Sequence, residues 1–189
     1  MMLPYTLIGI DPSYSRTGLC AVLQDGSKRV VFHTLSHPMT GKASVDGEVK
    51  RGFHAVFESA FALANDVATW VRSFGSVGVI MEEPLPASSM SPALYALDSM
   101  IFERLHDSVI HTYNPSTLRT IHSKRDYTKT DSVNRATKLL EKFLAAGWGV
   151  PVVSKTNRVR PPCHDCCEAF LYICHYLNTN GMNLKTITF

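Results

Sequence analysis

Residues 5–36, YTLIGIDPSYSRTGLCAVLQDGSKRVVFHTLS, hold three short apolar runs separated by turn residues, and this pattern decides the fold class. The first run ends at Asp11 and is followed by PSYS. Asp25 and Gly26 separate the second run from the third, and such a pair is a strong hairpin signal because glycine readily takes a positive φ. The stretch therefore predicts three antiparallel strands joined by tight turns.

Beyond residue 36 the chain is predicted to alternate helices with strands, from apolar spacings of three or four and from short continuous apolar runs. The predicted elements are helices over about residues 53–73, 93–106, 130–146 and 163–177 and strands at 77–83 and 108–113. Thr130 or Asp131 is expected to cap the third helix. The order predicts an α/β protein whose five-stranded mixed sheet, three antiparallel strands and then two parallel ones, is flanked by helices. This is the strand order of the ribonuclease H-like fold.

Composition sets limits on the class of protein. The chain has 189 residues, 45% hydrophobic and 19% charged, which predicts one domain over residues 1–189 and excludes a disordered chain. No apolar run approaches the roughly 18 residues of a membrane helix, so no membrane partner is expected. Five cysteines, four of them close together, do not suggest a secreted disulfide framework. We expect a cytoplasmic location, the host cytoplasm if the protein is viral, with an organelle as the open alternative.

The positive charge is concentrated in one part of the chain. Residues 1–111 hold 8 Lys and Arg against 11 Asp and Glu, whereas residues 112–189 hold 11 against 5. Ten of these basic residues fall within residues 119–160. Such a segment favours a phosphate-backbone partner, although an ordinary solvated face would have the same composition.

Four acidic positions fall where the predicted fold would bring them together. Asp11 ends the first strand, and Glu82 or Glu83 ends the strand at 77–83. Asp165 and Glu168 are three residues apart at the start of the last helix, so they share one face. Crowded carboxylates repel one another unless a cation neutralises them, and a set of oxygen ligands suits Mg²⁺ or Mn²⁺. Two such ions could activate a water and stabilise the leaving oxygen of a phosphodiester.

These motifs resemble those of the RuvC-type Holliday junction resolvases. IGIDPSYSRTG (residues 8–18) resembles the first motif, IMEEP (80–84) the second, and HDCCEAF (164–170) the last acidic motif. NPSTLRTIHSKRDYTKTDSV (114–133) resembles the basic segment of the family, with Arg119 and Lys129 on two of its lysine positions. The differences are Ser13 after Asp-Pro, Glu in place of Asp at residue 168, and Leu85 where bacterial members carry an aromatic wedge. They suggest a phage or organellar branch.

The resemblance implies a dimeric, metal-dependent endonuclease that cleaves four-way junctions and other branched DNA with symmetric nicks. It implies two Mg²⁺ ions per active site, with Mn²⁺ as a substitute, held by Asp11, Glu82, Asp165 and Glu168, and Lys129 as a further catalytic residue. Between the adjacent acids, Glu82 is preferred because it directly follows the apolar run, whereas Glu83 precedes a proline at the point where the chain leaves the sheet. The basic residues expected to contact DNA are Arg119, Lys124, Arg125, Lys129, Arg158 and Arg160.

Alternative interpretations remain at this point. Another ribonuclease H-like nuclease, either an exonuclease or an RNA–DNA hybrid nuclease, would share the fold, and a junction-binding protein without activity would share the surface. Cys163, His164, Cys166 and Cys167 lack the separated pairs of a zinc site, so we expect reduced thiols there. His164 is kept as a neighbour of the acids. Phe53, Phe57, Phe61 and Trp70 form a helical stripe that we expect to be core.

Overall fold

The computed structural model describes residues 6–13, 16–23, 26–37, 42–45, 48–51, 53–83, 92–114, 116–123, 126–153, 156, 158–160 and 163–181. Lys124 and Arg125, which are predicted to contact DNA, and Leu85, at the position of the bacterial aromatic wedge, lie outside these ranges. Within the described ranges, the helices are all too short or too polar to cross a lipid bilayer.

A five-stranded mixed sheet forms the centre of the molecule. Its strands are β1 (Thr6–Asp11), β2 (Thr17–Leu23), β3 (Arg29–Leu35), β6 (Val77–Glu82) and β7 (Val109–Tyr113). They lie in the order β3-β2-β1-β6-β7, and the two pairs within β1–β3 are antiparallel, whereas β6 runs parallel to both β1 and β7. The predicted fold class is thereby confirmed, including three antiparallel strands followed by two parallel ones.

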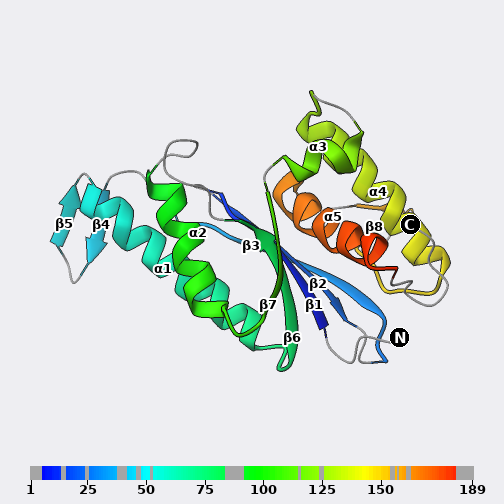
Figure 1. Ribbon diagram of the computed structural model, residues 1–189, viewed down its shortest axis with the longest axis horizontal. Coiled ribbons are helices and arrows are strands. Elements are labelled where there is room, and N and C mark those ends of the chain that lie inside the picture. Colours follow the sequence, from blue (N-terminus) through cyan, green and yellow to red (C-terminus); the bar gives the residue numbers. More distant parts are fainter. Residues whose placement is uncertain are drawn as a thin grey trace.

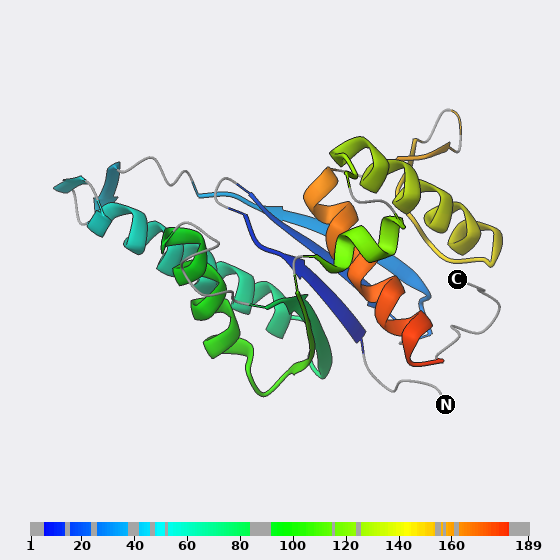
Figure 2. The same ribbon diagram turned by 45° about the horizontal axis from the view of Figure 1, so that its top comes forward.

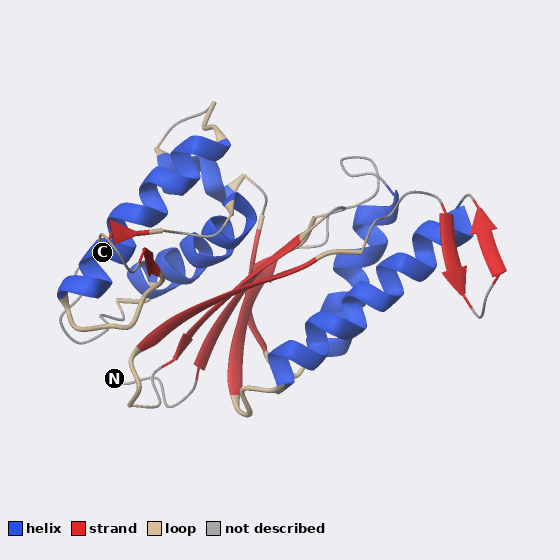
Figure 3. Ribbon diagram, turned by 180° about the vertical axis from the view of Figure 1, so that it is seen from behind, coloured by secondary structure: helices blue, strands red, loops and turns tan. Residues whose placement is uncertain are grey.

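Helices cover both faces of this sheet (Figure 1). They are α1 (Phe53–Arg72), α2 (Pro92–Leu105), α3 (Thr117–His122), α4 (Lys129–Ala145) and α5 (His164–Thr179). Figure 3 shows the sheet from behind, with α1 and α2 on one side and the other three helices on the opposite side. Two small pairs of strands complete the described structure, β4 (Lys42–Val45) with β5 (Glu48–Arg51) and β8 (Val152–Val153) with β9 (Arg158–Val159).

Alternation along β1 separates two apolar cores. Ile8 and Ile10 pack with the α1 and α2 side, whereas Leu7 packs with residues of α4 and α5. Because neighbouring side chains in a strand point to opposite faces, Asp11 shares the face of Leu7 and points to the α5 side. The parity of this strand therefore decides which helix can complete a site around Asp11.

Two glycines let α5 lie directly on the strands, as Figure 2 shows for the helix coloured orange to red. A Cβ at Gly9 would come within 2.0 Å of the backbone oxygen of Ala169. A Cβ at Gly18 would come within 2.2 Å of the backbone carbon of Asp165. Real Cβ atoms do not approach other atoms so closely. Asp165 can therefore occupy its position only because residue 18 is a glycine.

Three details differ from the sequence-based expectations. The N-cap of α4 is Thr128, which forms a capping box with Asp131, and neither Thr130 nor Asp131 is the cap. The short pairs β4–β5 and β8–β9 were not predicted. Phe57 and Phe61 are 44% and 50% exposed rather than core, because α1 buries its smaller residues against the sheet instead.

Candidate active site

Asp11 and Glu82 lie side by side at one edge of the sheet. They are the last residues of the parallel neighbours β1 and β6, and the preceding residues Ile10 and Met81 are paired in register. The carboxyl ends of parallel strands meet at the same edge, so the two acidic side chains emerge together. Asp11 is buried and Glu82 is half-buried, whereas Glu83 is exposed.

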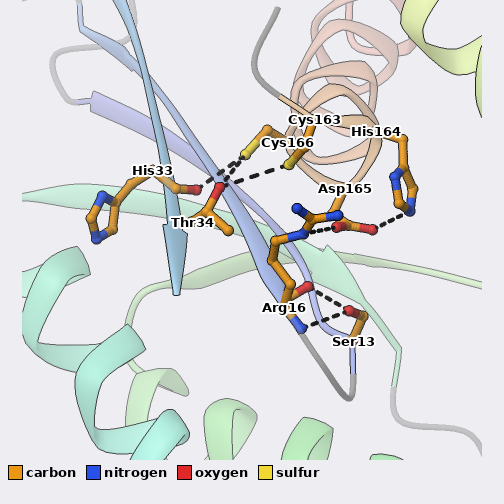
Figure 4. Close-up of polar contacts among 8 residues, drawn as sticks. All are labelled: Ser13, Arg16, His33, Thr34, Cys163, His164, Asp165 and Cys166. Atoms are coloured by element: carbon orange, nitrogen blue, oxygen red, sulfur yellow. Dashed lines mark hydrogen bonds and ion pairs between the residues drawn. The ribbon is translucent and has the colours of Figure 1, made fainter. Parts of the chain in front are cut away.

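Helix α5 packs on the face of the sheet, and its first turn brings Asp165 to this edge. Its carboxylate accepts a hydrogen bond from Arg16 Nε at 3.1 Å and lies 2.5 Å from Nε2 of His164 (Figure 4). Arg16 is exposed, and its loop is closed by a hydrogen bond from the Ser13 hydroxyl to the Arg16 carbonyl. Asp165 is therefore held between a cation of the β1–β2 turn and an imidazole of its own helix.

Glu168, one turn further along α5, contacts the neighbouring helix α4. Ser132 of α4 donates a hydrogen bond of 2.8 Å to its Oε1. Lys129, the first residue of α4, is exposed, and its ammonium group favours the charged form of the Glu168 carboxyl. Burial outweighs both contacts, however, and raises the pKa of Glu168. Among the predicted acids, Lys129 therefore influences the charge of Glu168, and its catalytic role stays a prediction.

The pKa values of the acids show how closely they are gathered. Burial raises the pKa of Asp11 well above its usual value, and the charges of Glu168, Glu82 and Asp165 raise it further. Burial also raises the pKa of Glu82 to about 7, against a hydrogen bond from Tyr172 that lowers it. A cation between these groups would remove the cost of their mutual repulsion.

Asp98 of α2 is a fifth acid that the sequence analysis missed. It is 1% exposed, and its Oδ1 has no hydrogen-bond partner among the described residues. Burial, followed by the charge of Glu82, raises its pKa to about 8. A single Asp in a helix carries no pattern that separates a buried acid from a surface one, so no sequence signal identified it.

The sequence analysis also assigned no role to Tyr172, Tyr127 or Ser132. Tyr172 donates a hydrogen bond of 3.3 Å to Oε2 of Glu82. Burial, followed by the charges of Glu168 and Asp11, raises the pKa of Tyr127 to about 12. The spacing of Glu168 and Tyr172, four residues apart on one helix, is a signal that could have identified Tyr172.

The donor set fits a hard divalent cation in chemistry, since the four predicted ligands offer oxygen atoms alone. In this arrangement, however, no three His, Cys, Asp or Glu side chains of the described ranges lie close enough to share an ion. Three of the acids are each held by a different protein partner, Asp165 by Arg16, Glu82 by Tyr172 and Glu168 by Ser132. Each of these bonds engages one carboxylate oxygen, which in Glu82 and Glu168 leaves the other oxygen available to an ion.

The described basic residues predicted to bind DNA are all exposed. Arg119 lies on α3, Lys129 begins α4, and Arg158 and Arg160 lie in and just after β9. These elements belong to the α3–α5 side of the sheet, which is also the side of Asp11 and Glu168. The charged surface and the acids are therefore on the same side of the molecule.

Comparison with known proteins gives matches by structure and none by sequence. No family model matches the chain, and no curated protein does. RuvC from Thermus thermophilus in complex with a Holliday junction substrate superposes with a TM-score of 0.57 at 13% identity, covering 94% of this chain and 96% of that one. The fold is that of RuvC.

A second structure of Thermus thermophilus RuvC gives a TM-score of 0.53 at 16% identity, covering 97% of this chain and 98% of that one. The yeast mitochondrial Holliday junction resolvase Ydc2 gives 0.48 at 14% identity, over 88% and 76% of the two chains. The likeness to RuvC spans nearly the whole of both chains, and at these identities the shared property is the fold. The chemistry has to be argued from the residues of this chain.

Proposed function

We propose that this protein is a structure-selective endonuclease that cleaves Holliday junctions and other branched DNA by metal-dependent hydrolysis of phosphodiesters. One observation carries the proposal. Asp11, Glu82, Asp165 and Glu168 converge on one edge of the sheet from β1, β6 and α5, within a RuvC fold. The raised pKa values of Asp11, Glu82 and Glu168 support a site adapted to hold cations.

These four carboxylates would hold Mg²⁺, or Mn²⁺ in its place, with two ions per site. The bound ions supply an activated water and stabilise charge on the leaving oxygen. The chain's own residues prepare that site: Arg16 and His164 orient Asp165, Ser132 orients Glu168, and Tyr172 orients Glu82. Lys129 places a positive charge beside Glu168, where it would contact a phosphate of the substrate.

We also propose that the active form is a homodimer, because paired symmetric nicks require two active sites related by a two-fold axis. Exposed aromatic side chains on the layer opposite the acids support this proposal. They are Phe57, Phe61, Tyr95 and Phe102 of α1 and α2. Measurement of the mass in solution, free and with DNA, should give two protomers per junction. A monomer bound to the junction and nicking one strand would contradict the dimer.

The decisive experiment is cleavage of a synthetic four-way junction in Mg²⁺, Mn²⁺ or EDTA, with linear duplex of the same sequence as control. We expect cleavage of the junction alone, and none in EDTA. Asp11→Asn should abolish cleavage and leave junction binding intact or tighter, because it removes a metal ligand together with a negative charge that faces phosphate. Loss of binding along with cleavage would argue against a ligand role for Asp11.

A junction-binding protein without nuclease activity is the second candidate. The observation that favours it is that no three of the described acids lie within reach of one ion. The same experiment separates the two functions, because an inactive binder would retain the junction in a gel and leave it intact in both metals.

A further inference from the structure

Cys163 and Cys166 form a CxxC pair across the first turn of α5. Cys163 is the N-cap and Cys166 the third residue of the helix, two positions whose side chains meet at a helix start. Oγ1 of Thr34 lies 3.7 Å from the sulfur of Cys163 and 3.3 Å from the sulfur of Cys166, as Figure 4 shows. Both sulfurs therefore contact the same hydroxyl oxygen and lie no more than 7.0 Å apart, the sum of these two distances.

The two thiols differ in access. Cys163 is half-buried, whereas the other four cysteines of the chain are buried, and all five are free thiols. The sulfur of Cys166 lies 3.2 Å from the backbone oxygen of His33, under the first turn of the helix. An oxidant in solution therefore reaches Cys163 first and finds a second thiol directly behind it.

The turn between the two cysteines contains Asp165 and is closely packed against the sheet. Its backbone lies against Gly18, which is paired with Thr34 in the neighbouring strand. A disulfide requires sulfurs about 2.05 Å apart and Cβ atoms about 3.5–4.5 Å apart, so forming the bond would fix the separation of residues 163 and 166. Because Gly18 blocks movement of the turn toward the sheet, any adjustment of the Asp165 backbone would carry it away from β2.

From this geometry we propose that Cys163 and Cys166 are an oxidisable dithiol whose disulfide displaces Asp165 and switches off the carboxylate site. The oxidant is a peroxide or a small-molecule disulfide. The consequence for cleavage rests on the nuclease function proposed above, whereas formation of the disulfide does not.

The chemistry balances with hydrogen peroxide as the oxidant. The sulfur of Cys163 attacks one peroxide oxygen, the O–O bond breaks, one water leaves, and Cys163 becomes a sulfenic acid. The sulfur of Cys166 then attacks the sulfur of Cys163, the S–S bond forms, the S–O bond breaks, and a second water leaves. The two thiols lose two electrons and the peroxide gains them. A dithiol reductant reverses the change by exchange.

The first part of the test measures the thiols of the full-length protein. After treatment with hydrogen peroxide, trapping with an alkylating reagent should modify three of the five cysteines, and peptide mapping should link residue 163 to residue 166. Cys163→Ser should leave no such link. Cys167→Ala is the matched control, because it removes a buried thiol of the same turn and should leave the link in place. Absence of the 163–166 link in the wild type would overturn the proposal.

The second part compares the reduced, oxidised and re-reduced protein in junction cleavage. Misplacement of a catalytic group by about 1 Å can cost on the order of a hundredfold in rate, and we expect a loss of that size that dithiothreitol restores. Cys163→Ser should cleave at the same rate before and after peroxide. A linked protein that cleaves at the full rate would overturn the switch.

A third measurement keeps the proposal separable from the nuclease function. If the reduced protein cleaves no junction, the proposed function fails, and the switch is tested by the rise in melting temperature that Mn²⁺ produces. That rise should be smaller in the oxidised protein than in the reduced one, with Cys163→Ser unaffected by peroxide. Equal rises in both forms would show that the disulfide does not disturb the acids.

Discussion

The hydroxyl of Tyr172 lies 3.3 Å from Oε2 of Glu82 and donates a hydrogen bond to it. Tyr172 is fully buried in α5, and Glu82 is the last residue of β6. The bond therefore joins the helix that supplies two of the acids to the strand that supplies a third. It also favours the charged form of Glu82, against the effect of burial.

Tyr172→Phe should raise the pKa of Glu82 above its present value of about 7. Glu82 would then lose its proton at higher pH, so the acidic limb of the pH–rate profile for junction cleavage should move to higher pH. Tyr95→Phe, on the exposed face of α2, is the matched control and should leave the profile in place. An unchanged profile for Tyr172→Phe would show that this bond does not control the charge of Glu82.

Glu82→Gln and Glu83→Gln should differ greatly in effect. The first removes a half-buried carboxylate beside Asp11, and we expect a loss of several orders of magnitude in cleavage rate. The second alters an exposed side chain, and the loss should be tenfold or less, about 1.4 kcal/mol in the barrier. Single-turnover cleavage of the junction measures both. The reverse order of effects would place the catalytic residue one position later.

The metal-free protein should become less stable as the pH rises from about 5 to about 8. Glu82 and Asp98 have folded-state pKa values of about 7 and about 8, above the values of 4.5 and 3.8 that the groups ordinarily have. The folded state therefore binds more protons than the unfolded state across this range, and the stability that this gives is lost as the pH rises through the folded-state values. The melting temperature in EDTA should fall by about 5 °C or more, since 1 kcal/mol corresponds to about 2–4 °C.

Asp98→Asn tests whether Asp98 causes this loss of stability at higher pH, because an asparagine side chain has no proton to release in this range. The variant should show a flatter dependence of melting temperature on pH, whereas Asp107→Asn, at an exposed position, should not. Mg²⁺ should raise the melting temperature of the wild type more at pH 8 than at pH 5. A pH dependence identical in Asp98→Asn and the wild type would contradict the assignment.

Removal of positive charge on the α3–α5 side should weaken DNA binding in a salt-dependent way. Arg119→Gln and Lys129→Gln should each lower the slope of log K against log salt by about one. The same is expected at Lys124 and Arg125, which lie outside the described residues. Arg72→Gln, at the end of α1 on the opposite layer, is the control and should keep the slope. An unchanged slope for Lys129→Gln would show that Lys129 lies on a solvated face and contacts no phosphate of the DNA.

Much of the fold could be predicted because its signals are local. Glycine turns and short apolar runs predicted the meander, and the end of an apolar run predicted the edge that carries Asp11 and Glu82. The shared helical face of Asp165 and Glu168 follows from their spacing alone. Their contacts with Ser132 and Arg16 could not be predicted in the same way, because these depend on how α4 and the β1–β2 turn pack against α5.

The exposed aromatics of α1 show where a local pattern misleads. Phe57 and Phe61 have helical spacing, but a second stripe of Ala60, Ala64 and Val67 on the same helix packs against the sheet. Small side chains allow the closer approach, so they occupy the core and the larger rings lie at its margin. Thr128 is different, since Thr128 and Asp131 form a capping box that was readable from the sequence.

The acids of this site come from distant parts of the chain. Asp11 and Glu82 belong to the first half, whereas Asp165 and Glu168 enter with α5, after more than 160 residues have been made. A growing chain that stops before α5 carries half of the carboxylates and has no helix on Gly9 and Gly18. During synthesis on the ribosome the proposed nuclease centre is therefore incomplete, and the cleavage of DNA that we propose could begin only once the last helix has docked.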